Sequence, residues 1–480
     1  MISWLATQSQ CRPDEPAFGF EGTTYTYGEL GHEAQSRAAY LADRGIGPGD
    51  KVGLMARNSP DWIFSLHAIL WRGATVVPLH FRATSAELED QLADIDVEFV
   101  IGGESLRALP ASEKGVLFEA LSRSDGVNSQ PVQVAPNQVA TVLFTSGTTG
   151  RAKKVPLTFD NHSASAVASA LRLGRHDDDH WLCCLPLCHI GGLAIVLRSV
   201  IYGTSFELCR GFEATRAVEL LATRRITLAS FVPTMLHRVL ATRTGLFDTD
   251  LRALLIGGGP IRGEALRQAR KRGLPVAPSF GMTEAASQLT TLSPEAPEHR
   301  LDSAGRALRG VELHIQGRGG LTASPGEPGM IWVRGPMVSE TYLDNNERPG
   351  WYCTGDVGAV DEQGFLSIHH RLTERIVTGG ENVDPGEVEE VLREVPEVLN
   401  AAVVGIDDEQ WGQIVAAAVA VGDGLSPQIV GALQAHCRQT LAGFKIPRRW
   451  KVVDELPTTA AGKLRRTSIR ELFNDTPSDA

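Results

Sequence analysis

The chain up to about residue 310 alternates between two hydrophobic patterns. Apolar residues recur every three or four positions after residue 26 and again over 61–70, which is the spacing of one helix face. Short apolar runs lie between them, at residues 51–55 and 74–79, and such runs are typical of buried strands. Because alternating helices and strands fold into layers around mostly parallel sheets, the pattern predicts an α/β fold.

The pattern changes near residue 310. Glycine and proline become frequent there, and a second alternation of strands and helices begins after about Arg371. A chain of 480 residues is too long for one hydrophobic core. We therefore expect a large N-terminal domain of layered α/β sheets over residues 1–371, which includes a small β-rich subdomain at about 310–371. A small α+β C-terminal domain is expected over 372–480.

Composition and charge exclude several classes of protein. The net charge is −11 and no dense cluster of Lys and Arg is present, which argues against nucleic acid or an anionic membrane as the main partner. No apolar run reaches the ~18 residues that span a bilayer. The first residues lack the basic segment and long apolar core of a signal peptide. The seven cysteines are scattered, which fits reduced thiols, so we expect a cytoplasmic protein.

Four potential metal ligands lie close together in the chain. They are Cys183, Cys184, Cys188 and His189. Their spacing does not form the two Cys-x-x-Cys pairs that are typical of a structural zinc site. Residues 181–187 also form an apolar run that predicts a buried strand, in which cysteine is a small apolar residue. We favour the buried strand and keep zinc as the weaker alternative.

A polar run at residues 145–154 follows an apolar strand predicted at 140–144. Its glycines let the backbone approach a ligand closely, and its N–H groups, hydroxyls and lysine suit phosphate oxygens. It is not a P-loop, because Gly147 and Gly150 are too close and Arg151 replaces the lysine. A polar surface loop is the alternative for this run alone. The residues predicted to bind phosphate are Thr145, Ser146, Gly147, Thr148, Thr149, Gly150 and Lys153.

A second glycine-rich turn follows the apolar strand predicted at 251–256. A strand, a turn and then a helix place the turn at the carboxyl edge of a sheet, where ligands of α/β proteins bind. We therefore expect Gly258, Gly259 and Pro260 to contact the nucleotide.

The polar run resembles the phosphate-binding loop of the adenylate-forming enzymes, which include acyl-CoA synthetases, peptide-synthetase adenylation domains and luciferases. Their usual pattern is Thr-Ser-Gly-Thr-Thr-Gly, then Arg, Lys or Glu, then Pro-Lys-Gly-Val. This chain keeps the first six residues, Lys153 and Val155, and departs from the pattern at Ala152 and Lys154. Further segments match the same superfamily in the expected order, namely residues 280–284, 351–356, 371–382 and 457–463. Five motifs in order make the resemblance specific.

The resemblance implies a reaction in two halves. A carboxylate attacks the α-phosphate of ATP, which gives an acyl-adenylate and pyrophosphate, and the thiol of CoA then attacks the acyl carbon and releases AMP. Lys463 is expected to supply positive charge between the attacking carboxylate and the phosphate, although most lysines are simply exposed at the surface. Glu284 is expected to hold Mg²⁺, and Thr283 to bond the α-phosphate.

The resemblance also assigns residues to the nucleoside. Phe280 is expected to stack on adenine, in a motif that continues with Gly281 and Met282. Asp356 is expected to accept both ribose hydroxyls, a task that suits the two oxygens of a carboxylate. Arg371 is expected to reach the ribose and the phosphate.

The superfamily rotates its small C-terminal domain between the two half-reactions. Gly379 and Gly380 are expected to face the site for thioester formation, where glycine leaves room for the pantetheine arm. Thr373 stands where the hinge usually holds Asp or Lys.

A narrower resemblance rests on residues 186–193, 198, 202–203, 230–236, 257–260, 287–288 and 290–292. These segments look most like those of the o-succinylbenzoate–CoA ligases of menaquinone synthesis. Such an acid has a second carboxylate, and Arg198 is the candidate partner because a guanidinium matches carboxylate geometry. A snorkelling arginine of a helix, with its charged end in water, is an equal alternative. His189 is expected to line the pocket entrance, with a buried structural histidine as the alternative. The expected substrate residues are His189, Arg198, Phe231 and Ser287.

Three functions stay open from the sequence. The first is o-succinylbenzoate–CoA ligase, and the second is another acyl- or aryl-CoA ligase or a stand-alone enzyme that loads a carrier protein. The third is a catalytically dead homologue that only binds ligands, against which the presence of all the charged motif residues argues. The expected ligands are ATP, Mg²⁺, coenzyme A and a small carboxylic acid, without nucleic acid or membrane insertion. A homodimer is expected only from the resemblance.

Overall fold

The computed structural model describes residues 2–83, 85–93, 95–110, 114–121, 129–146, 152–259, 263–343, 348–371, 376–378, 381–383, 385–408, 411–422, 428–441, 443–459 and 464–474. The chain divides into two compact units. The first contains Met1–Leu313, Trp332–Tyr352 and Gln363–Leu366. The second contains His314–Ile331, Cys353–Glu362 and Ser367–Ala480.

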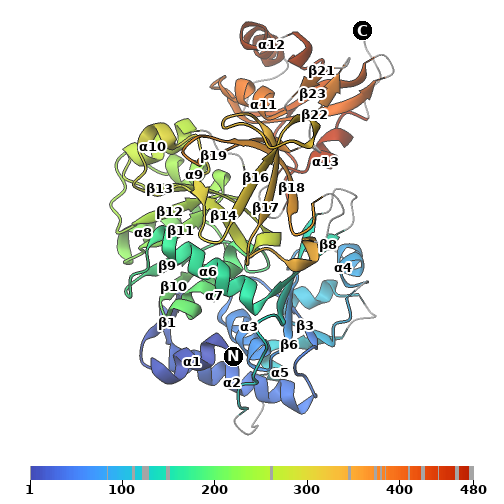
Figure 1. Ribbon diagram of the computed structural model, residues 1–480. Coiled ribbons are helices and arrows are strands. Elements are labelled where there is room, and N and C mark those ends of the chain that lie inside the picture. Colours follow the sequence, from blue (N-terminus) through green and yellow to red (C-terminus); the bar gives the residue numbers. More distant parts are fainter. Residues whose placement is uncertain are drawn as a thin grey trace. The chain divides into compact units, whose positions relative to one another are not determined.

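The described part of the first unit contains a nine-stranded sheet (Figure 1). Its strands, in spatial order, are β15 (Arg306–Ala307), β14 (Ser287–Thr291), β13 (Val276–Met282), β12 (Ala253–Ile256), β11 (Leu228–Phe231), β9 (His180–Cys183), β10 (Ser205–Leu208), β1 (Pro16–Phe20) and β2 (Thr23–Thr26). The pairs from β13 to β1 are parallel, and the outer pairs are antiparallel. The carboxyl ends of the central strands therefore meet at one edge.

A six-stranded sheet forms the other half of the first unit. Its order is β6 (Gly115–Leu117), β5 (Phe99–Gly102), β3 (Lys51–Met55), β4 (Thr75–Pro78), β7 (Val139–Ser146) and β8 (Ala152–Thr158). All pairs are parallel except β7–β8. Val76 and Val77 belong to different hydrophobic cores, because successive strand residues point to opposite faces.

Helices fill the space between these sheets and cover their outer faces. The helices of the first unit are α1 (Trp4–Cys11), α2 (Tyr27–Asp43), α3 (Pro60–Trp71), α4 (Ser85–Leu92), α5 (Phe118–Leu121), α6 (Phe159–Leu173), α7 (Ile190–Tyr202), α8 (Ala214–Thr223), α9 (Pro233–Ala241) and α10 (Gly263–Lys271). Helix α6 contacts β8 of one sheet and β14 of the other, and α7 runs beside α6 (Figure 1). The two helices therefore form a middle layer between the sheets.

Helix α2 begins with a capping box. The Thr26 side chain accepts from the backbone N–H of Glu29 at 3.2 Å, and the Glu29 carboxylate accepts from the N–H of Thr26 at 2.8 Å. These reciprocal bonds satisfy two amides that a helix leaves open at its first turn. The apolar side of α2 is buried, as its spacing predicts, and its buried members include Leu30, Ala34, Ala38 and Leu41.

The second unit contains two sheets of its own. A four-stranded sheet has the order β16 (Glu312–Gln316), β17 (Gly329–Arg334), β18 (Tyr352–Val360) and β19 (Leu366–Arg371), with most of its residues in this unit. The other sheet has the order β21 (Glu381–Val383), β20 (Ile376–Thr378), β23 (Gly412–Val421) and β22 (Val398–Asp408), with β24 (Arg449–Val453) beside β23. Three helices accompany it, α11 (Pro385–Arg393), α12 (Gln428–Thr440) and α13 (Arg466–Glu471).

The α/β fold and the separate C-terminal α+β part agree with the sequence prediction. The strand predicted at 181–187 is shorter than expected, because it ends at Cys183 and the chain then turns toward α7. Cys184 is nevertheless buried, as that prediction requires, and so is Cys188 just beyond the predicted strand. Among the described residues, no helix has both the length and the apolar character needed to cross a bilayer.

Candidate active site

The described residues of the polar run predicted to bind phosphate belong to the two strands of a β-hairpin. Strands β7 and β8 are antiparallel, and Thr145 pairs with Lys153. Lys153 is exposed. The buried positions of both strands anchor this hairpin in the six-stranded sheet.

The predicted magnesium ligand Glu284 lies beside this hairpin. Glu284 belongs to a short 3₁₀ turn (Thr283–Ala285) that directly follows β13 and contacts β8. The hydroxyl of Tyr352 donates to Oε1 of Glu284 at 3.4 Å, and the hydroxyl of Tyr342 donates to the carbonyl of Lys154 at 2.8 Å. The two tyrosine rings meet edge to face, with centroids 5.4 Å apart. Two motifs about 130 residues apart in the sequence are thus neighbours in the fold.

The carboxylate of Glu284 lies close enough to Tyr342 to influence the pKa of that tyrosine. Burial, followed by the Glu284 carboxylate, raises the pKa of Tyr342 to about 12. The backbone N–H of Ser339 also donates to the Glu284 carbonyl at 2.8 Å. The turn that carries the carboxylate is therefore held through its own backbone and through neighbouring tyrosines.

The backbone after Glu284 is strained. Ala286 and Ser287 have φ values of +48° and +109°, a region that residues with a Cβ rarely adopt. The adjoining strands are unusually close there, since a Cβ at Gly281 would lie 1.8 Å from the carbonyl oxygen of Ser287. This turn brings Glu284 and Gln288 to the same end of β13 and β14.

A buried cation lies on the other side of that turn. Arg198 of α7 is 3% exposed, and it donates to Oε1 of Gln288 at 2.8 Å and to Oγ of Ser165 at 2.9 Å. Ser165 in turn donates to the carbonyl of Ala286 at 2.7 Å. Among the described residues, no carboxylate pairs with this guanidinium and its Nε has no partner.

A charge in such a place is unfavourable by itself. Burial lowers the pKa of Arg198, because removal of the guanidinium from water disfavours its charged form. Neutral hydrogen-bond acceptors compensate only part of that loss. The arrangement fits an anionic group that comes from outside the described residues.

The predicted site residues at the carboxyl edge of the nine-stranded sheet differ from one another in backbone conformation, burial and contacts. Gly258 has a φ of +79°, which favours glycine, and it follows β12 together with Gly259. Phe231 ends β11 but is only 2% exposed, and its ring packs edge to face on Phe212 at 5.7 Å. His189 precedes α7, and its ring centroid lies 5.6 Å from that of His80.

The remaining residues that are predicted to bind the nucleotide lie in the second unit or outside the described residues. Asp356 is a buried residue of β18, and its N–H donates to Oγ1 of Thr354 at 3.1 Å. Arg371 ends β19. The predicted site residues outside the described part of the chain are Gly147, Thr148, Thr149, Gly150, Pro260, Gly379, Gly380 and Lys463.

The sequence did not reveal the residues that hold this site together. Asn58 is 4% exposed, donates to the carbonyls of Leu185 and Cys209 at 2.9 and 3.0 Å, and accepts from the N–H of Leu187 at 3.1 Å. Ser165 was also missed, since it looks like any small residue of an amphipathic helix. Neither residue has a signal in the sequence, because the carbonyl of Leu185 that Asn58 bonds and the carbonyl of Ala286 that Ser165 bonds lie more than 100 residues away.

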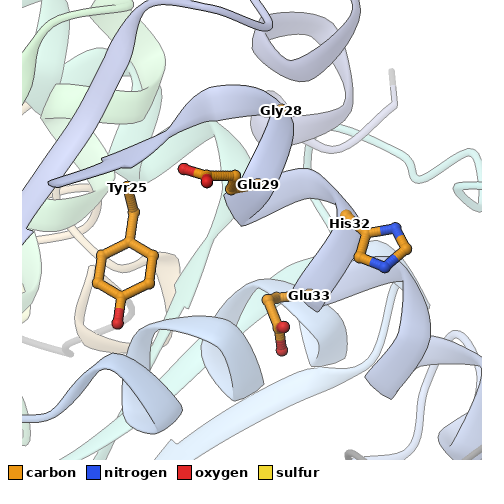
Figure 2. A pocket seen from close by; sticks show the side chains of 5 residues that line it. All are labelled: Tyr25, Gly28, Glu29, His32 and Glu33. Carbon is orange, nitrogen blue, oxygen red and sulfur yellow. The ribbon is translucent and has the colours of Figure 1, made fainter. Parts of the chain in front are cut away.

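Two cavities in the first unit do not coincide with these residues. One of about 330 Å³ lies at the start of α2 and is lined by Tyr25, Gly28, Glu29, His32 and Glu33 (Figure 2). Its two carboxylates make it unsuitable for a phosphate. Another of about 430 Å³ includes His180 and Ser205, which begin β9 and β10. It therefore lies at the amino ends of these strands, opposite the edge where the candidate residues gather.

Comparison with known proteins gives the class of this chain. Residues 5–343 match the AMP-binding enzyme family, and residues 387–463 match the AMP-binding enzyme C-terminal domain. The chain therefore belongs to the AMP-binding enzyme family, and the superfamily inferred from the five motifs is confirmed.

The similar proteins extend over the whole chain. The 2-succinylbenzoate–CoA ligase of Geobacillus kaustophilus is 40% identical over 487 residues, which cover 99% of each chain. The o-succinylbenzoate CoA synthetase of Bacillus subtilis, solved with the acyl-adenylate intermediate OSB-AMP, has a TM-score of 0.91 and 33% identity, and covers 100% of this chain and 99% of that chain. The same synthetase with ATP and magnesium ion has a TM-score of 0.89 and 34% identity, and covers 98% and 99%.

Proposed function

We propose that this chain is an ATP-dependent ligase that joins 2-succinylbenzoate to coenzyme A through an acyl-adenylate. It converts ATP, the acid and CoA into the acyl-CoA, AMP and pyrophosphate, as a step of menaquinone biosynthesis. The observation that carries this proposal is the buried guanidinium of Arg198, which has only neutral partners among the described residues. A diacid supplies the missing negative charge, whereas a fatty acid does not. Full-length similarity to ligases of the same name supports the same substrate.

In the first half-reaction the chain supplies placement and positive charge. The hairpin residues near Thr145 and Lys153 cradle the phosphates, and Thr283 bonds the α-phosphate. Glu284 holds Mg²⁺, since a half-buried carboxylate with an open oxygen is a good ligand for a hard cation. When bound, the ion neutralises phosphate charge. Lys463 places its ammonium between the acid carboxylate and the phosphate, where charge moves as the new bond forms.

Residues of three motifs hold the nucleoside. Phe280 stacks on adenine next to Gly281 and Met282, and the turn of Gly258, Gly259 and Pro260 borders the same base. Asp356 accepts from the ribose hydroxyls and Arg371 donates to the ribose and phosphate. Each role is one that the residue's chemistry allows.

The acid lies between α7 and the turn after Glu284. Arg198 binds its aromatic carboxylate, His189 lines the entrance, and Phe231 and Ser287 border the ring and the succinyl arm. The strained backbone at Ser287 supports this assignment, because such strain persists where the surrounding structure fixes a functional geometry.

The second half-reaction needs a rearrangement of the C-terminal domain. We place the domain boundary between residues 371 and 372, with a β-rich subdomain at about 310–371. Rotation at this boundary moves Lys463 away from the site and brings Gly379 and Gly380 to it. The two glycines give the pantetheine arm room to reach the acyl carbon.

A coupled AMP-release assay tests the proposed function. The purified chain is given ATP, Mg²⁺ and CoA with 2-succinylbenzoate, benzoate, fatty acids or amino acids. We expect turnover with 2-succinylbenzoate and little with benzoate, which lacks the second carboxylate. Turnover only with another acid would overturn the substrate but keep the ligase chemistry. Adenylation without CoA turnover would favour a carrier-protein acceptor.

The remaining parts of the proposal concern the protein's setting. Seven free thiols among the cysteines support a cytoplasmic location, where such thiols stay reduced. The chain is proposed to act as a homodimer and without nucleic acid. Light scattering after size-exclusion chromatography tests the dimer, and a gel-shift experiment tests the absence of nucleic acid.

A further inference from the structure

A cluster of nitrogen and sulfur ligands lies beside the candidate active site. His80 follows β4 in the six-stranded sheet, and Cys188 and His189 belong to the segment between β9 and α7. One ligand atom from each of these three side chains lies within 4.8 Å of the other two. The sequence offered Cys183 and Cys184 beside Cys188 and His189 as potential ligands, but Cys183 and Cys184 do not belong to this group, and His80 was not foreseen.

The donor atoms determine which metal suits the cluster. Two imidazole nitrogens and one thiolate favour Zn²⁺ and similar borderline or soft cations, whereas Mg²⁺ prefers oxygen. A tetrahedral zinc site with bonds of about 2.0–2.3 Å places its ligands roughly 3.5 Å apart. Ligand atoms within 4.8 Å therefore need to move by only about 1 Å, which side-chain rotation provides. Water or a substrate carboxylate fills the fourth position.

The segment that carries Cys188 is already fixed. Asn58 bonds the carbonyl of Leu185 and the N–H of Leu187, and the N–H of His189 donates to the carbonyl of Pro186 at 3.1 Å. A metal ion that binds here therefore orders little backbone. The ring of His80 is half exposed, which leaves a path from solvent.

One contact limits the affinity. The N–H of Arg82 donates to Nδ1 of His80 at 3.1 Å. A metal ion has to replace this donor at Nδ1 or turn the ring so that another tautomer presents Nε2. Such a site is reversible rather than a permanent structural site.

We propose that His80, Cys188 and His189 form a reversible binding site for Zn²⁺, and that an occupied site slows adenylation. On binding, the Cys188 thiol releases its proton to solvent and its sulfur bonds the metal. The site obstructs the acid because His189 is also proposed to line the acid entrance. Only this inhibitory part rests on the proposed function.

Cobalt substitution tests the site without any enzyme activity. Co²⁺ titrated into the full chain under reducing conditions should give the thiolate-to-cobalt absorption of a tetrahedral site, and one equivalent of Zn²⁺ should remove it. Cys188→Ser and Cys188→Ala should each abolish this absorption, and His80→Gln should weaken binding by at least about ten-fold.

Matched controls separate this site from adventitious binding. Cys11→Ser and His32→Ala change an exposed thiol and an exposed imidazole outside the cluster, and both should bind Co²⁺ like the unmodified chain. No absorption in the unmodified chain, or equal absorption after Cys188→Ser, would overturn the site. Circular dichroism of each variant checks that it is folded.

Zinc inhibition tests the second part. Pyrophosphate exchange is measured in excess Mg²⁺, with the rate of each variant expressed relative to its own zinc-free rate. We expect micromolar Zn²⁺ to inhibit the unmodified chain and Cys11→Ser, and the half-inhibitory concentration to rise at least ten-fold for Cys188→Ser. Equal inhibition of all variants would overturn the inhibitory role. Absence of exchange in every sample without zinc would contradict the proposed function instead.

Discussion

The guanidinium of Arg198 is unusual because its charge is buried among neutral groups. Gln288 and Ser165 accept from its two terminal nitrogens, and Nε has no partner among the described residues. The sequence left its role open, since an arginine in an apolar helix looks like a snorkelling side chain. Burial at 3% exposure removes that alternative, because a snorkelling arginine keeps its charged end in water. The group that the guanidinium can bind therefore depends on the charge of the residues that contact it.

Gln288→Glu tests whether Arg198 keeps its charge for a substrate. The new carboxylate should pair with Arg198 at the 2.8 Å position of the present amide oxygen and so compete with the acid. We expect KM for 2-succinylbenzoate to rise by about ten-fold or more, which is what loss of a bond to a charged group costs. The volume-matched neutral variant Gln288→Met should raise it less. An equal rise of KM in Gln288→Glu and Gln288→Met, or an unchanged KM for 2-succinylbenzoate, would contradict the role of Arg198 in binding the substrate.

At the scale of elements, the loops after the strands carry the site, and long-range hydrogen bonds fix them. These loops are the turn after β13 and the segment before α7, together with the β7–β8 hairpin. Their existence follows from local patterns, such as polar residues and glycine after an apolar run. Their mutual positions do not, because Asn58 reaches residues 127 and 151 positions away and Tyr342 reaches one 188 positions away.

Asn58→Ala tests this view of the loops. The change removes both donors and the acceptor and leaves the buried carbonyl of Leu185 and the N–H of Leu187 without their partner. We expect a loss of about 2–4 kcal/mol of unfolding free energy, since each unsatisfied buried group costs about 1–3 kcal/mol. Thermal and urea unfolding measure it. Asn137→Ala, at an exposed position, serves as the control and should change stability by less than about 0.5 kcal/mol.

At the scale of the whole molecule, buried histidines link stability to pH. Burial, followed by the charge of Arg198, lowers the pKa of His162 to about 3, whereas the unfolded value is about 6.5. Between these two values the unfolded chain binds a proton that the folded chain excludes. Stability is therefore fully present above pH 6.5 and falls as pH drops, by up to about 1.4 kcal/mol per pH unit for this group.

His162→Gln isolates that contribution. The melting temperature of the unmodified chain should fall between pH 7 and pH 5 more than that of the variant, so the difference between them depends on pH. His32→Gln changes an exposed histidine and should leave the pH dependence unaltered. Parallel curves for the unmodified chain and His162→Gln would show that His162 titrates normally.

The two proposed half-reactions should be separable by a change at one residue. Lys463→Ala should abolish acyl-adenylate formation and leave CoA attack on supplied acyl-adenylate nearly intact, because its charge is needed only at the phosphate. Pyrophosphate exchange and thioester formation measure the two steps separately. Lys451→Ala, on β24 of the same unit, is the matched control. Equal loss of both steps in Lys463→Ala would refute this assignment.

The sequence by itself determined the family, the α/β layers and the nucleotide motifs. These features follow from the period of the hydrophobic residues and from short contiguous motifs. Such patterns act between neighbouring residues, as the capping box at Thr26 shows, and can therefore be recognised in the sequence. Only the tertiary structure decided which residues meet, since contacts between distant segments depend on how the sheets and the α6–α7 layer pack. It placed Glu284 beside the hairpin, gave Arg198 neutral partners, and brought His80, rather than Cys183 or Cys184, close to Cys188 and His189.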